Sequence, residues 1–260
     1  MQACTRPNLG GMMYRVWMQR FYAARPPANY FEIGTSHGHT LALPPCASVA
    51  VDPIFRAQTP EVAAHILNKP SMAYFRMKSD AFFARHDPVH LFGRPIDVAF
   101  LDGAHQCEVM LRDFIGTERA CTPHSVVMLH DCLPVEAGIA TRDHEEATSA
   151  DALRQGWWTG DVWRTALLLR RVRPDLRMVT LDSATSGLTL VTGLDPANRV
   201  LADGYDGFVA EMLGWTLEDI GLDRLFEALD VQPTGEWVNP AKLTAAFPPA
   251  GDPVTARAAA

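Results

Sequence analysis

The chain has 260 residues, 48% of them hydrophobic, so it can bury a sizeable core as one domain with appendages. Its formal net charge is -7 and its lysines and arginines are scattered, so the sequence has no basic stripe that could neutralise a phosphate backbone. This argues against nucleic acid as a partner. The five cysteines form no Cys-x-x-Cys pair, and no apolar run is long enough to span a membrane. We therefore expect reduced thiols in a cytoplasmic protein without a membrane segment.

Apolar residues at helix-like spacing predict a leading amphipathic helix over residues 11–24, which ends before Pro26 and Pro27. An exposed aromatic helix of this kind is also a reason to expect a homo-oligomer. Farther along, short apolar runs alternate with amphipathic stretches. The runs predict strands and the stretches predict crossover helices, which gives a parallel sheet covered on both faces. The strands are expected at 30–33, 48–51, 73–77, 96–101 and 125–129, and the helices at 60–67, 80–86 and 108–119.

The second half of the chain has a different pattern. Residues 133–160 hold no convincing strand and are interpreted as a lid segment over a substrate site. A helix is predicted over 162–172, followed by antiparallel strands at 177–181 and 188–192 around a short turn. Helical periodicity continues over 206–229, and a proline-rich and alanine-rich end follows. The predicted organisation is a helical extension (1–28), a main domain that includes the lid segment (29–195), and a helical appendage with a flexible tail (196–260).

The first predicted strand runs into a glycine-containing loop, Gly34-Thr35-Ser36-His37-Gly38, with a helix expected after it. Glycines allow a ligand to approach the backbone, and the crevice beyond the carboxyl end of a strand is the usual ligand site in an open sheet. The Gly-x-x-x-Gly spacing is not that of a nicotinamide-binding loop, and no Walker lysine follows. We interpret the loop as a cofactor loop of another kind.

Acidic residues follow the next two predicted strands. Asp52 ends the second strand, where a carboxylate can accept hydrogen bonds from both hydroxyls of a ribose. Ser79 and Asp80 follow the third strand, where an adenine amino group could be recognised. The alternative interpretation is structural, because turn glycines and helix-capping acids also occupy such positions.

The pattern formed by Glu32-x-Gly34-x-x-x-Gly38, Asp52, Ser79-Asp80 and residues 96–105 resembles the class I S-adenosylmethionine-dependent methyltransferases. More narrowly, it resembles the branch that contains macrocin O-methyltransferase and cephalosporin hydroxylase-like proteins. The resemblance extends over residues 30–194 and implies a Rossmann-like, doubly wound α/β fold. Its seven-stranded sheet would be mostly parallel, with an antiparallel C-terminal hairpin and helices on both faces. The implied cofactor residues are Glu32, Gly34, Thr35, Ser36 and Gly38 around the methionine portion, Asp52 at the ribose, Ser79 and Asp80 at the adenine, and Asp102.

A second cluster, Asp102, His105, His130 and Asp131, comes from the ends of two further strands, which should converge above the sheet. Metal-dependent O-methyltransferases hold a divalent cation at this place, where it binds the acceptor oxygens and lowers the pKa of the hydroxyl. The candidate ligands here are Asp102, His130 and Asp131. Relatives have two acids or an Asp-Asn pair in place of His130-Asp131, so either the preference moves from magnesium towards manganese, iron or zinc, or His130 is not a ligand.

The predicted activity is O-methylation of a small-molecule or glycan hydroxyl, with His105 as general base beside Asp102. Two alternatives stay open: a hydroxylase-like, metal-dependent oxygenase on the same fold, and a cofactor-binding subunit without catalysis. Trp157 and Trp158, near the end of the lid segment, could stack on a sugar ring, exclude water, or pack in the core.

Overall fold

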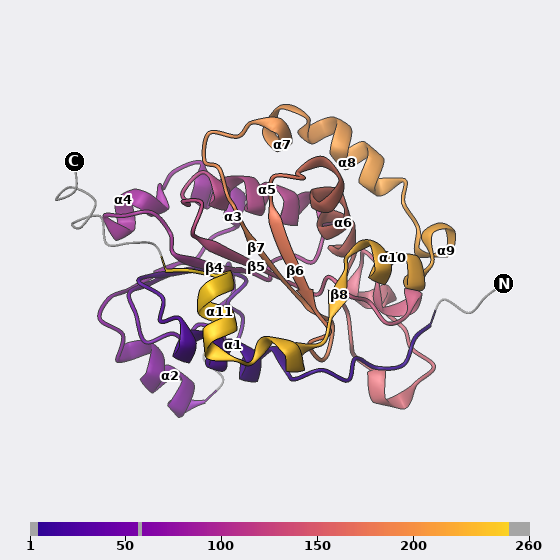
Figure 1. Cartoon of the computed structure of the whole chain (residues 1–260), viewed down its shortest axis with the longest axis horizontal. Coiled ribbons are helices and arrows are strands. Elements are labelled where there is room, and N and C mark those ends of the chain that lie inside the picture. Colours follow the sequence, from indigo (N-terminus) through magenta and orange to yellow (C-terminus); the bar gives the residue numbers. More distant parts are fainter. Residues whose placement is uncertain (1–4, 57–58, 250–260) are drawn as a thin grey trace.

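The computed structural model describes residues 5–56 and 59–249, which form one eight-stranded sheet between two layers of helices (Figure 1). The sheet order is β3-β2-β1-β4-β5-β7-β6-β8, in which β7 runs antiparallel to both of its neighbours and the other pairs are parallel. The strands are β1 (Tyr30–Ile33), β2 (Ser48–Val51), β3 (Met72–Phe75), β4 (Val98–Leu101), β5 (Val126–His130), β6 (Arg177–Leu181), β7 (Leu188–Thr192) and β8 (Val231–Gln232).

This sheet confirms the predicted α/β class and the antiparallel C-terminal hairpin. It differs from the expectation in having eight strands, because β8 adds a parallel edge strand to β6. β8 is only two residues long, too short for an alternating apolar pattern to appear in the sequence.

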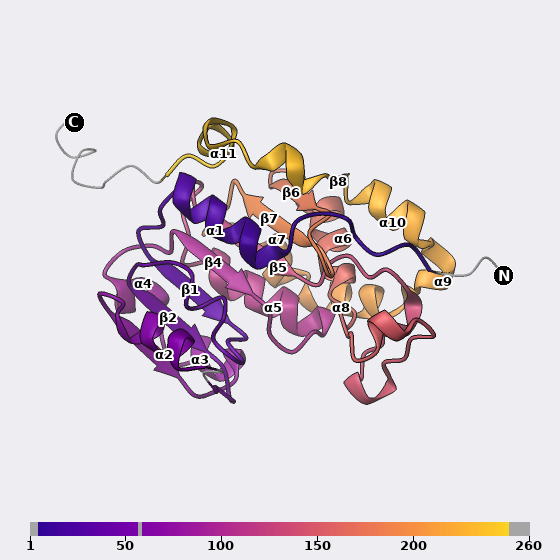
Figure 2. The same ribbon diagram turned by 90° about the horizontal axis from the view of Figure 1, so that it is seen from below.

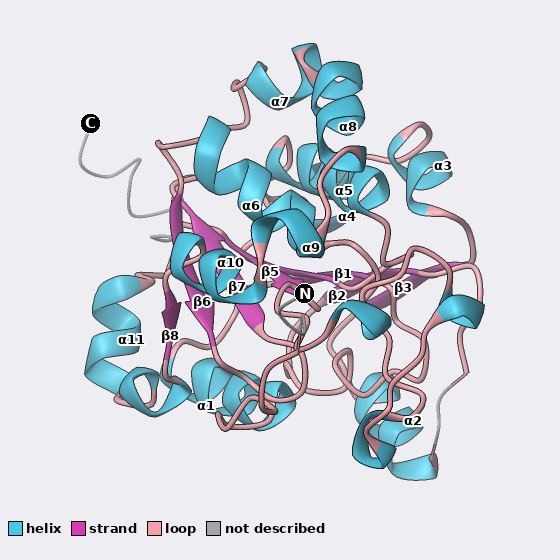
Figure 3. Cartoon of the chain, turned by 90° about the vertical axis from the view of Figure 1, so that its right-hand side faces the viewer, coloured by secondary structure: helices cyan, strands magenta, loops and turns pink. Residues whose placement is uncertain are grey.

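Helices cover both faces of the sheet (Figure 3). The strands β1, β2, β4 and β5 are buried on both sides, as is usual for a parallel sheet between helical layers. One face carries α1 (Tyr14–Ala24), α2 (Pro60–Leu67) and α11 (Pro240–Ala246). The other carries α3 (Ser79–Phe83), α4 (Pro88–Phe92), α5 (Cys107–Glu118), α6 (Trp163–Val172), α7 (Val200–Asp203) and α8 (Tyr205–Leu213), and the core on that side also takes in α9 (Leu217–Ile220) and α10 (Leu222–Ala228).

The leading helix α1 is part of the core. Trp17 and Phe21 are fully buried, and the Trp17 indole donates a hydrogen bond to the Trp237 carbonyl at 2.9 Å, so α1 lies beside the segment that carries Trp237 and α11 (Figure 2). At the end of α1, the Arg25 guanidinium donates to both carboxylate oxygens of Asp97, at 2.6 and 3.1 Å. These aromatic residues face inward, which removes the observation on which a homo-oligomer was expected.

Three expectations need correction. The helix predicted after the glycine loop is replaced by turns, because Pro44 and Pro45 lack the N–H groups that would extend the short turn formed by Ala42 N–H and the Gly38 carbonyl. The helix predicted over 206–229 is divided into α8, α9 and α10. Residues 231–249, predicted to be part of a flexible end, instead form β8, a 3-10 turn (Thr234–Trp237) and α11. The remaining tail, residues 250–260, lies outside the described residues.

Within residues 5–56 and 59–249, the structure has no helix long and apolar enough to cross a membrane.

Candidate functional site

The glycine loop after β1 lies directly against the turn that follows β4. Gly34 has φ 88°, and a Cβ at this position would lie 1.9 Å from the Asp102 carbonyl oxygen. Its N–H donates to the Val51 carbonyl at 3.0 Å. Only glycine fits this backbone conformation and this contact. The first loop and the Asp102 turn therefore share one surface at the carboxyl ends of the parallel strands.

Asp52 lies beside this loop and is held in a fixed orientation. Only 9% of its surface is exposed, and its two carboxylate oxygens accept hydrogen bonds from the N–H groups of Ser36 (2.8 Å) and Ile54 (2.7 Å). Each carboxylate oxygen has a second lone pair, so Asp52 can still accept hydrogen bonds from ligand hydroxyls. Its place and orientation suit the predicted ribose contact.

Glu32 lies beneath the loop and is completely buried. Its carboxylate accepts a hydrogen bond from the Tyr30 hydroxyl at 2.5 Å. Burial raises the pKa of Glu32 to about 7, although the hydroxyls of Tyr30, Thr40 and Thr35 favour the ionised form. Glu32 therefore supports the loop from inside the fold. Its predicted contact with the methionine portion stays a prediction.

The third predicted contact region starts α3. Ser79 is buried, whereas Asp80 is exposed and accepts a hydrogen bond from the Ala81 N–H at 2.7 Å. Asp113 of α5 reaches the same region: a Cβ on Gly103 would lie 3.3 Å from one of its carboxylate oxygens. Burial raises the pKa of Asp113 to about 7, opposed by a hydrogen bond from Ser79. Asp113 thus places a buried carboxyl group between the Asp102 turn and α3.

The ends of β4 and β5 bring Asp102, His105, His130 and Asp131 together. The Nε2 atom of His105 lies 3.2 Å from Asp102 and 3.3 Å from Asp131. The Nδ1 atom of His130 lies at the same two distances from these carboxylates. The Ser186 hydroxyl also donates to Asp131. The two imidazoles and two carboxylates thus form a compact four-membered cluster.

Opposite charges set the ionisation of this cluster. Burial alone would lower the pKa of His105, but Asp131 and Asp102 outweigh it and raise the pKa to about 9. The same two carboxylates raise the pKa of the fully buried His130. Burial would raise the pKa of Asp102, but the two histidines lower it well below its usual range. With both histidines protonated, the cluster is electrically neutral.

Aromatic rings from outside the parallel strands cover both histidines. Tyr14, at the start of α1, lies with its ring centroid 4.1 Å from that of His130. Trp158, from the lid segment, stacks on His105 at 4.7 Å with 20° between the planes. Trp158 was singled out from the sequence, but Tyr14 was not, because no motif links the leading helix to the strand ends.

A second group of possible metal ligands, Cys107, Glu108 and Asp161, is already neutralised. Arg142 pairs with both Glu108 and Asp161 at 2.6 Å, and Arg164 pairs with Asp161 at 2.6 Å. This group joins the lid segment to α5, and its carboxylates are not free for a cation.

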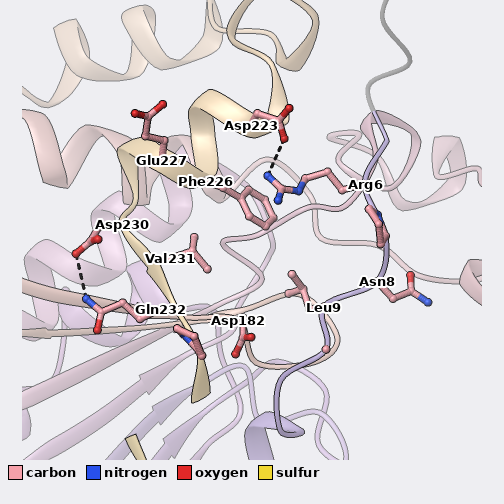
Figure 4. Close-up of a pocket in the computed structure, with 13 residues that line it drawn as sticks. Arg6, Asn8, Leu9, Asp182, Asp223, Phe226, Glu227, Asp230, Val231 and Gln232 are labelled. Atoms are coloured by element: carbon pink, nitrogen blue, oxygen red, sulfur yellow. Dashed lines mark hydrogen bonds and ion pairs between the residues drawn. The ribbon is translucent and has the colours of Figure 1, made fainter. Parts of the chain in front are cut away.

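A cavity of about 600 Å³ lies away from this cluster, between the N-terminal segment, α10 and β8 (Figure 4). Its most prominent contacts are the ion pair of Arg6 with Asp223 at 2.9 Å and the packing of the Arg6 guanidinium on the Phe226 ring at 4.2 Å. None of the predicted site residues lines this cavity, so it is separate from the candidate site.

Residues 31–132 match a family model described as a methyltransferase domain. The match is less than half of the chain, but it contains the glycine loop, Asp52, Asp80 and all four residues of the cluster. It identifies no particular branch of methyltransferases. No curated protein sequence matches the chain.

Several solved methyltransferase structures are similar to the chain at low sequence identity. The O-methyltransferase TomG from Streptomyces achromogenes, involved in tomaymycin synthesis and in complex with S-adenosylmethionine, is 18% identical over 72% of this chain and 82% of its own, with a TM-score of 0.47. An O-methyltransferase from Bacillus cereus in complex with S-adenosylhomocysteine is 15% identical over 69% and 80%, with a TM-score of 0.45. An S-adenosylhomocysteine-bound methyltransferase from Podospora anserina is 12% identical over 69% and 77%, with a TM-score of 0.46.

Proposed function

We propose that this chain is an S-adenosylmethionine-dependent methyltransferase that methylates a hydroxyl group of a small molecule or glycan. The observation that carries the proposal is the contact of the Gly34 loop with the Asp102 turn, beside a carboxylate fixed by two backbone N–H groups. This arrangement lies inside the segment that matches the methyltransferase domain model.

The chemistry of the cofactor site favours a cationic, non-phosphate ligand. Residues 34–40 contain no lysine or arginine that could bind a phosphate. Asp52 presents carboxylate oxygens to ribose hydroxyls, and the exposed Asp80 can accept a hydrogen bond from an adenine amino group. The same absence of lysine and arginine leaves no fixed positive charge in the loop to repel a sulfonium. The donor and acceptor groups present therefore fit S-adenosylmethionine.

Methyl transfer requires the acceptor oxygen to approach the cofactor methyl group in line, so much of the rate comes from positioning. His105 and Asp102 lie just beyond the glycine loop and are the groups that would hold the acceptor hydroxyl. Because Asp131 and Asp102 raise the pKa of His105, its ring must lose a proton before it can accept one from that hydroxyl. Asp102 and Asp131 then stabilise the ring when it is charged again.

The same cluster fits a divalent cation by its donor set. Ligand atoms of Asp102, His105 and Asp131 all lie within 4.8 Å of one another, so His105 stands in the ligand group where His130 was predicted, and with an ion bound there His105 would not act as the general base. The nitrogen-to-oxygen distances of 3.2 and 3.3 Å are close to the separation of about 3.4 Å expected between ligands about 2.1 Å from a tetrahedral ion. Two carboxylates with imidazole favour manganese, iron or zinc over magnesium. Such an ion, when bound, would polarise the acceptor hydroxyl and stabilise its ionised form.

Calorimetric titration with S-adenosylhomocysteine tests the cofactor assignment. Metal-stripped protein is titrated alone and then with Mn²⁺, Fe²⁺ or Zn²⁺. We expect binding that Asp52→Ala weakens by about tenfold or more, since a hydrogen bond to a charged group contributes about 1.5–3 kcal/mol. Asp203→Ala removes an exposed carboxylate of α7 and is the matched control, with no change expected. Absence of binding under every condition would contradict the proposal.

Two further outcomes separate the alternatives. Binding of S-adenosylhomocysteine without methyl transfer to any hydroxylated acceptor would point to a non-catalytic subunit. Oxygen consumption with Fe²⁺ and no cofactor binding would point to a hydroxylase-like oxygenase. The family-model match ranks methyl transfer ahead of both.

A further inference from the structure

His105 has an unusual backbone conformation that neighbouring residues must maintain. Its φ of 55° lies in the left-handed region, which is unfavourable for a residue with a Cβ. Its Nε2 atom nevertheless meets both Asp102 and Asp131. A turn of this kind persists only where surrounding contacts hold it.

The backbone at the end of the lid segment, Gly160, and of the next residue, Asp161, supplies two of these contacts. The Asp161 N–H donates to the His105 carbonyl at 3.0 Å. Gly160 has φ 61°, and a Cβ there would lie 1.8 Å from the same carbonyl oxygen. A glycine is therefore required for the lid backbone to reach the His105 turn.

The Trp158 side chain supplies a third contact, on the face of the His105 ring. The Trp158 indole is itself fixed, because its N–H donates to the Thr141 carbonyl at 2.7 Å and the His144 ring lies edge-on to it at 5.2 Å. A fixed aromatic plane against an imidazole restricts rotation of that ring about its side-chain bonds. The stacking therefore favours the orientation that points Nε2 at the carboxylates.

The end of the lid segment is anchored just beyond His105. One carboxylate oxygen of Asp161 accepts a hydrogen bond from the Cys107 N–H at 2.7 Å, at the start of α5. The other pairs with Arg142, which also holds Glu108. The lid segment and α5 are thus connected just beyond the His105 turn.

We propose that Trp158, Gly160 and Asp161 form a clamp that positions His105 in the acidic cluster, so that the lid segment completes the candidate active site. Trp158 is the positioning residue: it touches His105 and acts through it. The relevance of this clamp to methyl transfer rests on the proposed function, but the clamp itself is a property of the protein without ligands.

Nuclear magnetic resonance of protein labelled with ¹³C in its histidine rings tests the clamp directly. His105→Gln assigns the ring signals. In the wild type we expect a cross-relaxation peak between the His105 and Trp158 rings and an upfield position of the His105 ring protons. Trp158→Ala should move these protons downfield, and Trp158→Phe should restore part of the upfield shift because a stacked ring remains. Trp157→Ala, which removes the adjacent indole, should leave them unchanged.

Absence of the cross-peak in the wild type would overturn the proposal without any variant. Identical His105 signals in wild type and Trp158→Ala would also overturn it, as would failure of Trp158→Phe to restore any shift in a folded protein. Titration of the same samples with S-adenosylhomocysteine keeps the two proposals apart. Absence of S-adenosylhomocysteine binding in the wild type would contradict the proposed function. The ring signals would still show whether Trp158 positions His105.

Discussion

The buried carboxyl of Asp113 gives a quantitative prediction for pH-dependent stability. Burial raises its pKa from 3.8 to about 7 in the folded protein. A carboxyl whose folded pKa is raised stabilises the fold fully only below its unfolded pKa, and that contribution is lost as pH rises towards the folded value. Asp113→Asn cannot ionise. Between about pH 5 and about pH 8 the wild type should therefore lose up to about 3 kcal/mol more stability than this variant.

Urea unfolding of both proteins across this pH range measures the difference. Other buried acids, such as Glu32, titrate in both proteins and cancel. Glu227→Gln is the control: it removes an exposed acid of α10, and its curve should follow the wild type. Parallel curves for wild type and Asp113→Asn would refute the reasoning that desolvation dominates at this carboxyl.

Three further predictions concern the contacts around the site. Arg25→Met leaves the Asp97 carboxylate buried without its cationic partner, so urea unfolding should show a loss of about 3–5 kcal/mol. Arg25→Met/Asp97→Leu should recover only part of it, because Arg25 also donates to the Phe247 carbonyl and Asp97 also accepts from the Ala28 N–H; a loss below about 1 kcal/mol in the single variant would contradict this. Gly34→Ala places a methyl group 1.9 Å from the Asp102 carbonyl oxygen, so S-adenosylhomocysteine binding and the melting temperature should both fall. Unchanged binding would argue against the contact. Arg142→Ala removes the ion pairs that hold the lid segment to α5, so limited proteolysis should cut the lid faster than in the wild type. The exposed-surface control Arg199→Ala should be cut at the wild-type rate, and equal rates for all three proteins would exclude this anchoring role.

The central sheet could be predicted because its signals are local. The apolar runs that became β1, β2, β6 and β7 were placed at their observed bounds, since each is a buried strand ended by turn residues. β8 could not be predicted, because a two-residue edge strand is defined by its neighbour β6 and not by its own pattern. The absence of a helix after Gly38 does have a local signal, because Pro44 and Pro45 follow within about two helical turns.

The candidate site was predictable only in part. Adjacent strand ends in a parallel sheet meet at one edge, so the convergence of Asp102 with Asp131 follows from topology. The contacts of Tyr14 and Trp158 with the histidines depend on how α1 and the lid segment fold back over that edge. No spacing rule connects residues so distant in the chain, and these contacts are therefore properties of the tertiary structure alone.

The pairing of α1 with the C-terminal segment has a consequence for synthesis of the protein. Trp17 leaves the ribosome before its hydrogen-bond partner Trp237, which is 220 residues farther along the chain. At ordinary translation rates these residues are separated by roughly 10 to 45 s. During that interval α1 has no α11 beside it, and Arg25 lacks the carbonyl of Phe247. The face that holds Tyr14 against His130 is thus completed only after Trp237 and Phe247 have been synthesised.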